Sequence, residues 1–301
     1  MASHPMTPKL ICRASDLVTS REEVCRGFLS QAQAKSQKAT PYIKEAQELW
    51  STLQKISHPD QFFDVIPLRT LATAMGFSDK AQGYFSDAEL REAIKPVLGL
   101  ITKSHQTDFQ MEILYRFLLT RGDTLGGAVR NLTGESGPTK FIAAVVKALK
   151  ERGMKSTFFH GKTNEEKIKG IAWDQRVVFF DYKPKLIDKS VDVILLNNPL
   201  PPDARPEFLE DKTLYLACGE LKGGVDPAGA DEHWKTAGSA LERIRDRFGR
   251  LCPKLFFAAS AIEQAMAKEI FAQLKTGKLT HAANLTVENQ LEDLTRWLIS
   301  L

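Results

Sequence analysis

Long apolar runs are absent from this sequence of 301 residues. The longest uncharged apolar stretches, such as residues 141–146 and 193–196, are far shorter than the roughly 20 residues that a membrane-spanning helix needs. The first ten residues, MASHPMTPKL, contain no continuous apolar segment of the kind that a secretory signal has. We therefore expect a soluble intracellular protein that crosses no membrane.

Cysteine is also scarce, and its spacing excludes two classes of small stabilised domain. The four cysteines, Cys12, Cys25, Cys218 and Cys252, are scattered and form no CxxC pair. This argues against a zinc cluster and against a disulfide framework. Internal repeats, low-complexity segments and the Walker pattern are missing as well, so we do not expect a nucleoside triphosphate site.

Charge of one sign is not in large excess. The 41 basic and 37 acidic residues give a net charge of +4, which is compatible with nucleic acid but equally common in metabolic enzymes. Hydrophobic residues make up 43% and charged residues 26%, close to the averages of globular proteins. Disordered, collagen-like and coiled-coil chains are thereby excluded, and the length suffices for one large domain or two modest ones.

The first 120 residues have helical periodicity and contain no strand-like run. Helices are predicted over residues 22–34, 42–56, 86–101 and 109–120. Pro41 occupies the first-turn position that proline favours if a helix begins there. Ser86 and Glu89 form the capping-box pattern that opens the third helix. We therefore predict a helical N-terminal region.

The pattern changes after Gly153 to short runs rich in valine, isoleucine, leucine and aromatic residues. Strands are predicted over residues 175–182, 191–197, 213–222 and 254–260, and helices over 233–248, 261–274 and 289–301. A helix between the third and fourth strands forms a crossover unit, so part of the sheet should be parallel. The predicted fold class is α/β, a mixed β-sheet core flanked by helices, with a helical N-terminal region.

Glu220 and Lys222 stand at the end of the third predicted strand. Because side chains alternate along a strand, these two residues point to one side and Leu221 points into the core on the other. Glu-x-Lys is common by chance, and an exposed ion pair of this kind contributes little to stability. The pair alone therefore leaves a structural and a functional interpretation open.

Asp192 adds weight to the functional interpretation. It lies in an otherwise apolar strand, where an ionised carboxylate is costly unless it is paired or bound to a metal. Asp188 and Asp181 remain rival candidates in more polar surroundings. An acid on one strand and Glu-x-Lys on the next is a pattern of metal-dependent nucleases. Two carboxylates and the Leu221 carbonyl can hold Mg²⁺, and the lysine can orient or deprotonate a water.

The residues that follow Lys222 make the resemblance specific. The run ELKGGVDPAGADEHWKT (residues 220–236) resembles the active-site segment of type II restriction endonucleases of the AvaI/BsoBI family. The similarity extends to TRGDTLGGAVRNL (120–132), SDKAQGYF (78–85), KATP (38–41) and AANLT (282–286). These segments occur in the same order over nearly the whole chain. The resemblance implies a restriction-endonuclease-like core.

The same resemblance implies the roles of the site residues. The catalytic residues would be Asp192, Glu220, Lys222 and His233, and the ligands of Mg²⁺ would be Asp192, Glu220 and Leu221. By its residue type alone, His233 beside a tryptophan in a first helical turn is more often a packing or capping residue. A neutral imidazole is nevertheless a reasonable proton acceptor near neutral pH, and Asp231 is expected to cap its helix.

Further residues are candidates for contact with DNA. Lys80 and Asp226 match family positions that contact bases, and lysine can donate to guanine while aspartate accepts from cytosine. Both have plain alternatives, as a solvated helix-end lysine and as a turn residue before proline. Arg121, Arg130 and Asn131 surround a double glycine, and we expect this segment to be a loop that holds a phosphate.

These observations predict a Mg²⁺-dependent type II restriction endonuclease. By resemblance it would cut double-stranded DNA at a palindromic CYCGRG-type site, leave 5′-phosphates and act as a homodimer in the prokaryotic cytoplasm. Residues 1–122 would supply DNA and dimer contacts and residues 123–301 the catalytic core. Two alternatives remain open: a non-catalytic DNA-binding protein, and a repair nuclease that reads DNA structure on the same core.

Overall fold

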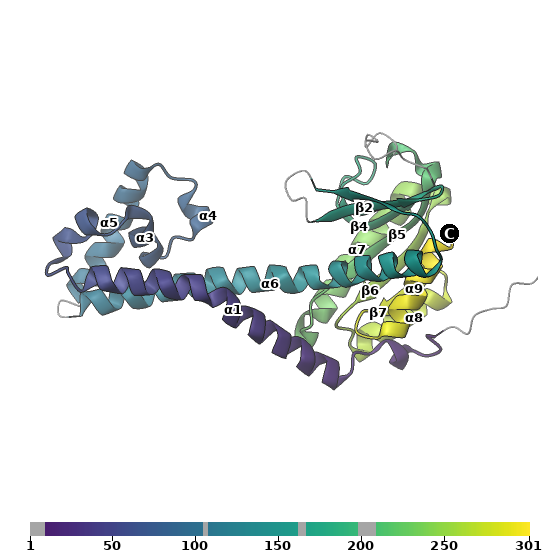
Figure 1. Cartoon of the computed structure of the whole chain (residues 1–301), viewed down its shortest axis with the longest axis horizontal. Coiled ribbons are helices and arrows are strands. Elements are labelled where there is room, and N and C mark those ends of the chain that lie inside the picture. Colours follow the sequence, from purple (N-terminus) through teal and green to yellow (C-terminus); the bar gives the residue numbers. More distant parts are fainter. Residues whose placement is uncertain (1–9, 105–107, 162–166, 198–208) are drawn as a thin grey trace, which may run out of the picture. The chain divides into compact units, whose positions relative to one another are not determined.

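The computed structural model describes residues 10–104, 108–161, 167–197 and 209–301. The chain forms two compact units, one of residues 1–28 and 133–301 and the other of residues 29–132. Two long helices, α1 (Arg21–Leu53) and α6 (Phe109–Glu151), contribute to both units (Figure 1). Within the described ranges, none of the helices is long and apolar enough to cross a membrane.

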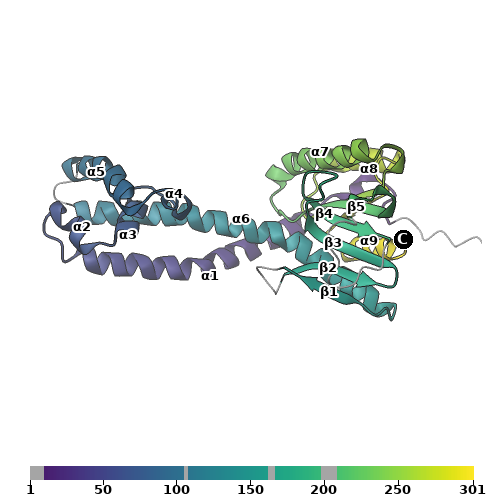
Figure 2. The ribbon, with the colours of Figure 1, turned by 90° about the horizontal axis from the view of Figure 1, so that it is seen from above.

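The first unit contains a mixed β-sheet. Its seven strands in the described residues follow chain order: β1 (Thr157–His160), β2 (Ile168–Trp173), β3 (Arg176–Tyr182), β4 (Val191–Leu196), β5 (Tyr215–Lys222), β6 (Lys254–Ala259) and β7 (His281–Asn284). Neighbours are antiparallel from β1 to β5, whereas β5, β6 and β7 are parallel. Figure 2 shows β1 to β5 side by side.

Helices cover both faces of this sheet. On one face, α7 (Ala230–Phe248) and α8 (Gln264–Lys275) contribute Trp234 and Ile270 to a buried cluster that also contains Phe257. On the other, the end of α6 and α9 (Glu288–Ile299) pack Phe141 and Leu294 against the sheet. The predicted fold class, a mixed sheet flanked by helices, is thereby confirmed.

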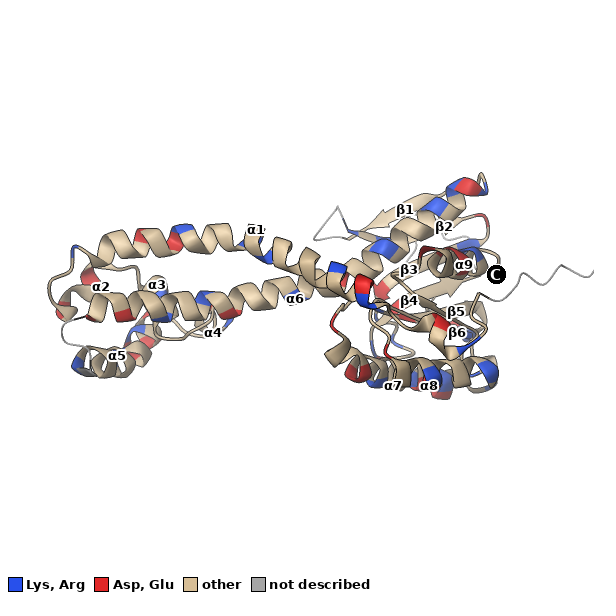
Figure 3. Cartoon of the chain, turned by 90° about the horizontal axis from the view of Figure 1, so that it is seen from below, with Lys and Arg blue, Asp and Glu red and all other residues tan. Residues whose placement is uncertain are grey.

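The crossover between β5 and β6 is also as predicted. The helix α7 links the two strands, and the pair is parallel, with Lys222 beside Ala259. The first turn of α7 carries acidic residues and its last turn carries Arg245 and Arg247 (Figure 3). These charges interact favourably with the helix dipole and stabilise the helix. The strands β1, β2 and β7 were not predicted; β7 has only four residues, HAAN, with two alanines and no β-branched side chain.

The second unit is helical in its described residues. Parts of α1 and α6 pack with α2 (Phe62–Val65), α3 (Leu68–Ala74), α4 (Asp79–Gln82) and α5 (Asp87–Ser104). Its core includes Phe62, Leu71 and Phe117. The predicted capping box at the start of α5 is confirmed, because the Ser86 N–H donates to Oε2 of Glu89 at 2.8 Å and the Glu89 N–H donates to Ser86 Oγ at 3.3 Å.

Short 3-10 helices complete the fold. They are η1 (Ala14–Leu17), η2 (Pro59–Gln61), η4 (Lys212–Leu214), η5 (Pro227–Gly229) and η6 (Gly249–Leu251). In η1, Leu17 is fully buried against the sheet. This contact places the residues that precede α1 in the first unit.

Two expectations about the helices are wrong. Pro41 does not begin a helix but lies inside α1, which continues because Leu49 and Leu53 anchor it in the core of the second unit. Residues 121–131 are not a phosphate-holding loop but the middle of α6. A helical glycine costs only about 1 kcal/mol relative to alanine, and Leu125 and Val129 are buried there, so the helix continues through the double glycine.

The boundaries of the two units differ from those of the regions predicted from the sequence, 1–122 and 123–301. The regions predicted from the sequence meet between residues 122 and 123, whereas α6 runs unbroken through that point and residues 10–28 precede the second unit in the chain. The functions expected of the two regions stay predictions.

Candidate active site

The carboxyl end of β5 brings two carboxylates and one ammonium group together. The antiparallel pairing of β4 with β5 runs as far as Val193 opposite Gly219, and Asp192 and Glu220 are the next residues on their strands. Lys222 is the last residue of β5. The two strands therefore carry the acidic side chains to the same point, where the ladder ends.

The contacts within this cluster are direct. The Lys222 ammonium donates to Glu220 Oε2 at 3.0 Å and to Asp192 Oδ2 at 3.4 Å. The Glu220 side chain is only 6% exposed, and those of Lys222 and Asp192 are 21% and 27% exposed. Leu221 points the other way and is buried in the core, which confirms the predicted alternation. The cluster is thus a partly buried group, unlike a solvated surface pair.

Burial and charge shift the acidity of this cluster. Burial, and then the negative charge of Asp192, raise the pKa of Glu220 to about 7, although Lys222 acts in the opposite direction. Burial would lower the pKa of Lys222, but the charges of Glu220 and Asp192 outweigh it and raise that pKa. The ammonium therefore stays protonated at neutral pH. Its single positive charge is shared between the carboxylates of Glu220 and Asp192.

This donor set fits a hard divalent cation. The oxygens available at the end of β5 are the two carboxylates and main-chain carbonyls, which are ligands that such a cation prefers. A larger group of three or more histidine, cysteine, aspartate or glutamate side chains arranged for a metal is not found in the described residues. The N–H of Leu221 donates to Asp192 Oδ2 at 2.7 Å. The N–H and C=O of one strand residue point toward the same edge of the strand. The Leu221 carbonyl therefore also faces the side on which Asp192 lies. An added cation would also favour the ionised form of Glu220.

The rival acids lie in other ion pairs. Asp188 Oδ1 is 3.0 Å from Lys183 Nζ at the surface. Asp181 pairs with Lys169 at 2.8 Å and accepts a hydrogen bond from the Ser190 hydroxyl. Of the three candidate acids, the structure brings Asp192 into contact with Lys222.

His233 lies on α7, in the helix that follows the glycine-rich segment after β5. Its side chain is exposed, and Nε2 is 3.2 Å from the point that a Cβ on Gly224 would occupy. In the described residues, no hydrogen bond or ion pair joins it to the cluster. The predicted cap is wrong, because α7 begins at Ala230 after Gly229, and Asp231 instead pairs with Lys235 within the first turns.

The exposed candidates for DNA contact differ in their surroundings. Lys80 is exposed on α4 and Asn131 on α6. Arg130 is exposed too, and its guanidinium folds back over Gly126 and Gly127 of its own helix. Asp226 accepts a hydrogen bond from the Ala228 N–H at 2.9 Å and thereby caps η5, which agrees with the turn interpretation.

Arg121 is engaged inside the second unit. Its Nη1 donates to both oxygens of Asp79, at 2.9 and 2.8 Å, and its Nε is 2.8 Å from Glu45 Oε2 without hydrogen-bond alignment. The guanidinium also lies over the rings of Tyr42 and Phe117. Only 15% of this side chain is exposed, so its main contacts are with protein groups.

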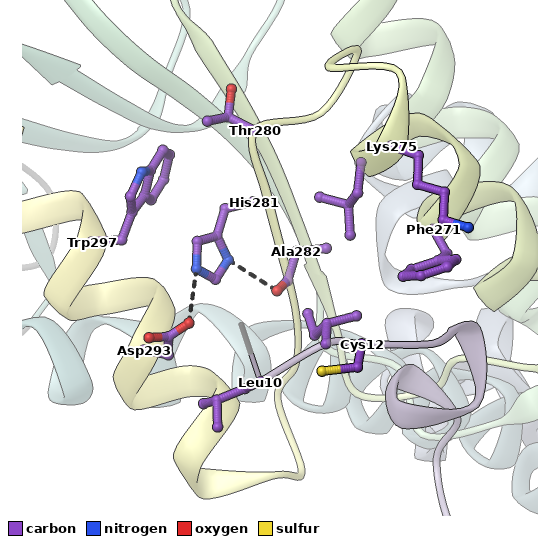
Figure 4. A pocket seen from close by; sticks show the side chains of 11 residues that line it. Leu10, Cys12, Phe271, Lys275, Thr280, His281, Ala282, Asp293 and Trp297 are labelled. Atoms are coloured by element: carbon purple, nitrogen blue, oxygen red, sulfur yellow. Dashed lines mark hydrogen bonds and ion pairs between the residues drawn. The ribbon is translucent and has the colours of Figure 1, made fainter. Parts of the chain in front are cut away.

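A cavity of about 570 Å³ lies elsewhere in the first unit (Figure 4). Phe271, Trp297, His281 and Asp293 are among its lining residues. His281 is level with Phe256 on β6, whereas Lys222 is level with Ala259, three residues further along. The cavity therefore lies toward the opposite end of the parallel strands from the Asp192–Glu220–Lys222 cluster.

A mixed sheet that brings Asp-Glu-x-Lys together at the end of two adjacent strands defines a restriction-endonuclease-like nuclease. The sequence also matches the restriction endonuclease BsobI family over residues 9–301, and the chain belongs to that family. It is therefore a type II site-specific deoxyribonuclease, and the resemblance noted in the sequence is confirmed.

Curated relatives match over nearly their full length. The type II restriction enzyme AvaI of Nostoc sp. is 37% identical over 310 residues, covering 95% of this chain and 96% of the relative, and AvaI of Anabaena variabilis gives the same values. The type II restriction enzyme BsoBI of Geobacillus stearothermophilus is 35% identical over 314 residues, or 95% of each chain.

Proposed function

We propose that this endonuclease hydrolyses double-stranded DNA with Mg²⁺ at a palindromic CYCGRG-type site and leaves 5′-phosphates. The observation that carries the proposal is the contact of Lys222 with both Glu220 and Asp192 at the end of β5. The membership in a restriction endonuclease family favours this function over the two alternatives, a non-catalytic DNA-binding protein and a structure-specific repair nuclease. Its place of action would be the prokaryotic cytoplasm.

The metal site of the proposal consists of Asp192, Glu220 and the Leu221 carbonyl. Mg²⁺ held by these groups would supply positive charge against the scissile phosphate and would make a nearby water easier to deprotonate. The buried Glu220 carboxylate is the ligand most dependent on this charge, because burial and Asp192 already raise its pKa. The bond from the Leu221 N–H and the contact with the Lys222 ammonium hold Asp192 in place.

Lys222 and His233 divide the remaining work in this proposal. Lys222 stays protonated beside two carboxylates, so it donates hydrogen bonds and orients the attacking water or the phosphate oxygens. A protonated ammonium is a poor proton acceptor. An imidazole is better suited to take the proton from the water, and the exposed His233 ring is open to solvent.

DNA recognition would use both units. Lys80 and Asp226 would read base edges, while Arg130 and Asn131 would contact phosphates. We propose that Arg121 contributes to DNA binding by supporting Asp79, the neighbour of Lys80, since its guanidinium is already occupied. A palindromic site has a two-fold axis, and a homodimer with a symmetric interface matches it.

A plasmid digest tests the function. The parent enzyme and Glu220→Gln would be incubated with supercoiled plasmid in Mg²⁺, in Ca²⁺ and in EDTA, and the fragment ends would be sequenced. We expect discrete fragments with palindromic ends from the parent in Mg²⁺ only, and intact but retarded DNA from the variant. Retarded, intact DNA from the parent would instead indicate a binding protein. Cleavage by the variant at the parental rate would refute the site.

Base readout has a separate test. Replacing Asp226 by alanine removes a possible acceptor for a cytosine amino group, a contact worth roughly 1–3 kcal/mol. We expect cleavage to become less selective at defined base pairs of the site, as measured on oligonucleotides with single substitutions. An unchanged selectivity profile would assign Asp226 to capping η5 alone.

A further inference from the structure

The residue directly after Lys222 is held against the helix α6. A Cβ on Gly223 would lie 2.5 Å from the carbonyl oxygen of Gly134, 2.6 Å from the nitrogen of Gly137 and 2.8 Å from the carbonyl oxygen of Thr133. From the other side, a Cβ on Gly137 would lie 2.7 Å from the Cα of Gly223. These are backbone atoms, which cannot turn aside, so main chain packs on main chain here.

Hydrogen bonds hold the same segment. The Lys222 carbonyl accepts from the Ser260 N–H at 2.9 Å, just beyond β6. The Gly223 carbonyl accepts from the hydroxyl of Ser136 on α6 at 3.3 Å, and that hydroxyl also bonds the Thr133 carbonyl at 2.8 Å. The main chain on both sides of the Lys222–Gly223 peptide is therefore anchored, on one side to the sheet and on the other to α6.

The first part of α1 touches the same segment two residues later. A Cβ on Gly27 would lie 2.6 Å from the Cβ of Val225. Residues 223–225 thus contact two helices, α6 at Gly223 and α1 at Val225. Both helices continue along the chain into the second unit, which contains Lys80 and Arg130.

We propose that Ser136 and Gly137 of α6 are positioning residues for cleavage, and that Gly27 of α1 assists them. They fix the backbone after Lys222, so the ammonium meets Glu220 and Asp192 at the observed distances. In this role they act through the backbone of Gly223 and are distinct from the proposed catalytic residues. This inference rests on the function proposed for Lys222, and it makes the active-site geometry depend on the course of α6.

Two glycines on one helix provide a matched test. Gly137→Ala adds a methyl group that has no room, whereas Gly134→Ala adds one in open space, where the higher helix propensity of alanine stabilises the helix. Single-turnover cleavage in Mg²⁺ at saturating DNA would be compared with cognate affinity in Ca²⁺. Because a displacement of 1 Å can cost about 100-fold in rate, we expect Gly137→Ala to cleave roughly 10- to 100-fold more slowly with unchanged affinity. Gly134→Ala should retain both values.

Ser136→Ala is the milder second variant, for use if Gly137→Ala does not fold. It removes the hydroxyl bond to Gly223 and leaves the helix backbone and its packing in place. Its single-turnover rate should fall while the melting temperature and the cognate affinity stay near the parental values. A decline of rate, affinity and melting temperature together would indicate a structural role and overturn the proposal.

Lys222→Ala separates failure of this inference from failure of the proposed function. If Lys222→Ala is inactive while Ser136→Ala and Gly137→Ala cleave at the parental rate, the site is correct and the positioning role is refuted. If Lys222→Ala itself cleaves at the parental rate, the function proposed for Lys222 fails, and the positioning role fails with it.

Discussion

The main-chain N–H of Leu221 donates a 2.7 Å hydrogen bond to Oδ2 of Asp192, so a side chain joins β4 and β5 beyond their last paired residues. This bond gives Asp192 a fixed orientation, and the same oxygen also receives the Lys222 ammonium. Two donors hold a carboxylate in one orientation, because charge-assisted hydrogen bonds are stronger than hydrogen bonds between neutral groups. These two contacts therefore fix the Asp192 carboxylate at the end of β5.

The first prediction compares Asp192→Asn with Asp188→Asn. The asparagine at 192 keeps the size of the side chain but removes a charge that faces Lys222 and the proposed metal, so we expect cleavage to fall by at least about 100-fold. Asp188 pairs with Lys183 at the surface, and its variant should cleave like the parent. Both would be assayed by single-turnover cleavage in Mg²⁺. An inactive Asp188→Asn beside an active Asp192→Asn would assign the role of the strand acid to Asp188.

The second prediction separates Arg121 from Arg130. Arg121→Ala removes ion pairs and ring contacts in the second unit, so urea unfolding should show a loss of about 1–2 kcal/mol, modest because its carboxylate partners are partly exposed. Arg130 is exposed, and Arg130→Ala should leave stability unchanged. If Arg130 contacts a phosphate, the affinity of the variant should fall for all DNA sequences alike. The slope of log affinity against log salt concentration should become shallower by about one.

The outcomes for these two arginines would contradict the assignment in different ways. Full stability of Arg121→Ala would mean that its contacts with Asp79 and Glu45 contribute nothing. Unchanged salt dependence in Arg130→Ala, measured with non-cognate DNA, would remove Arg130 from the interface. A variant that loses both stability and affinity would require the affinity to be measured again below its melting temperature.

Much of the fold was predictable because local patterns and tertiary packing agree. The strands near 176–182, 191–196, 215–222 and 254–259 are apolar runs, and the helix between the last two forces a parallel pair. The α6 segment was misjudged for the opposite reason. Its glycines predict a turn by themselves, but the burial of Leu125 and Val129 decides in favour of a helix.

The cluster at the end of β5 was predictable in part. Alternation places Glu220 and Lys222 on one side, and the apolar strand around Asp192 singles that residue out, but the distances between the strands depend on register. The role of Ser136 and Gly137 was not visible at all, since no local signal connects residues 136–137 with residue 223. The glycines themselves were the available signal, because they allow two backbones to approach.

The third prediction concerns His281, which lies beside the cavity. Burial lowers the pKa of His281, although Asp293 partly opposes this shift. The unfolded chain therefore binds a proton more readily than the folded protein. Stability contributed by the neutral ring is complete above the ordinary pKa of about 6.5 and declines as the pH falls through that value toward the lower folded pKa.

His281→Gln should remove this dependence, since an amide can still donate to Asp293 but does not titrate. We expect the parent to lose up to about 1.4 kcal/mol more per pH unit than the variant below pH 6.5, as measured by urea unfolding. His160→Gln, at an exposed position, is the control and should follow the parent. Parallel curves for parent and His281→Gln would contradict the burial effect, and cleavage at pH 8 should be equal in all three proteins.

The last prediction concerns His233. The segment between Lys222 and α7 is short, and the ring of His233 lies close to Gly224, two residues after Lys222, so the imidazole belongs to the same end of the sheet as the cluster. If it accepts the proton from the attacking water, His233→Ala should lower the single-turnover rate by about two to four orders of magnitude, the usual effect of a positioned acid or base. Cognate affinity in Ca²⁺ should stay unchanged, because the ring makes no proposed contact with bases. A variant that keeps the parental rate and pH profile would leave His233 as a surface residue of α7, and proton transfer would then have to pass to bulk water or a phosphate oxygen, since the charge of Lys222 is held by Glu220 and Asp192.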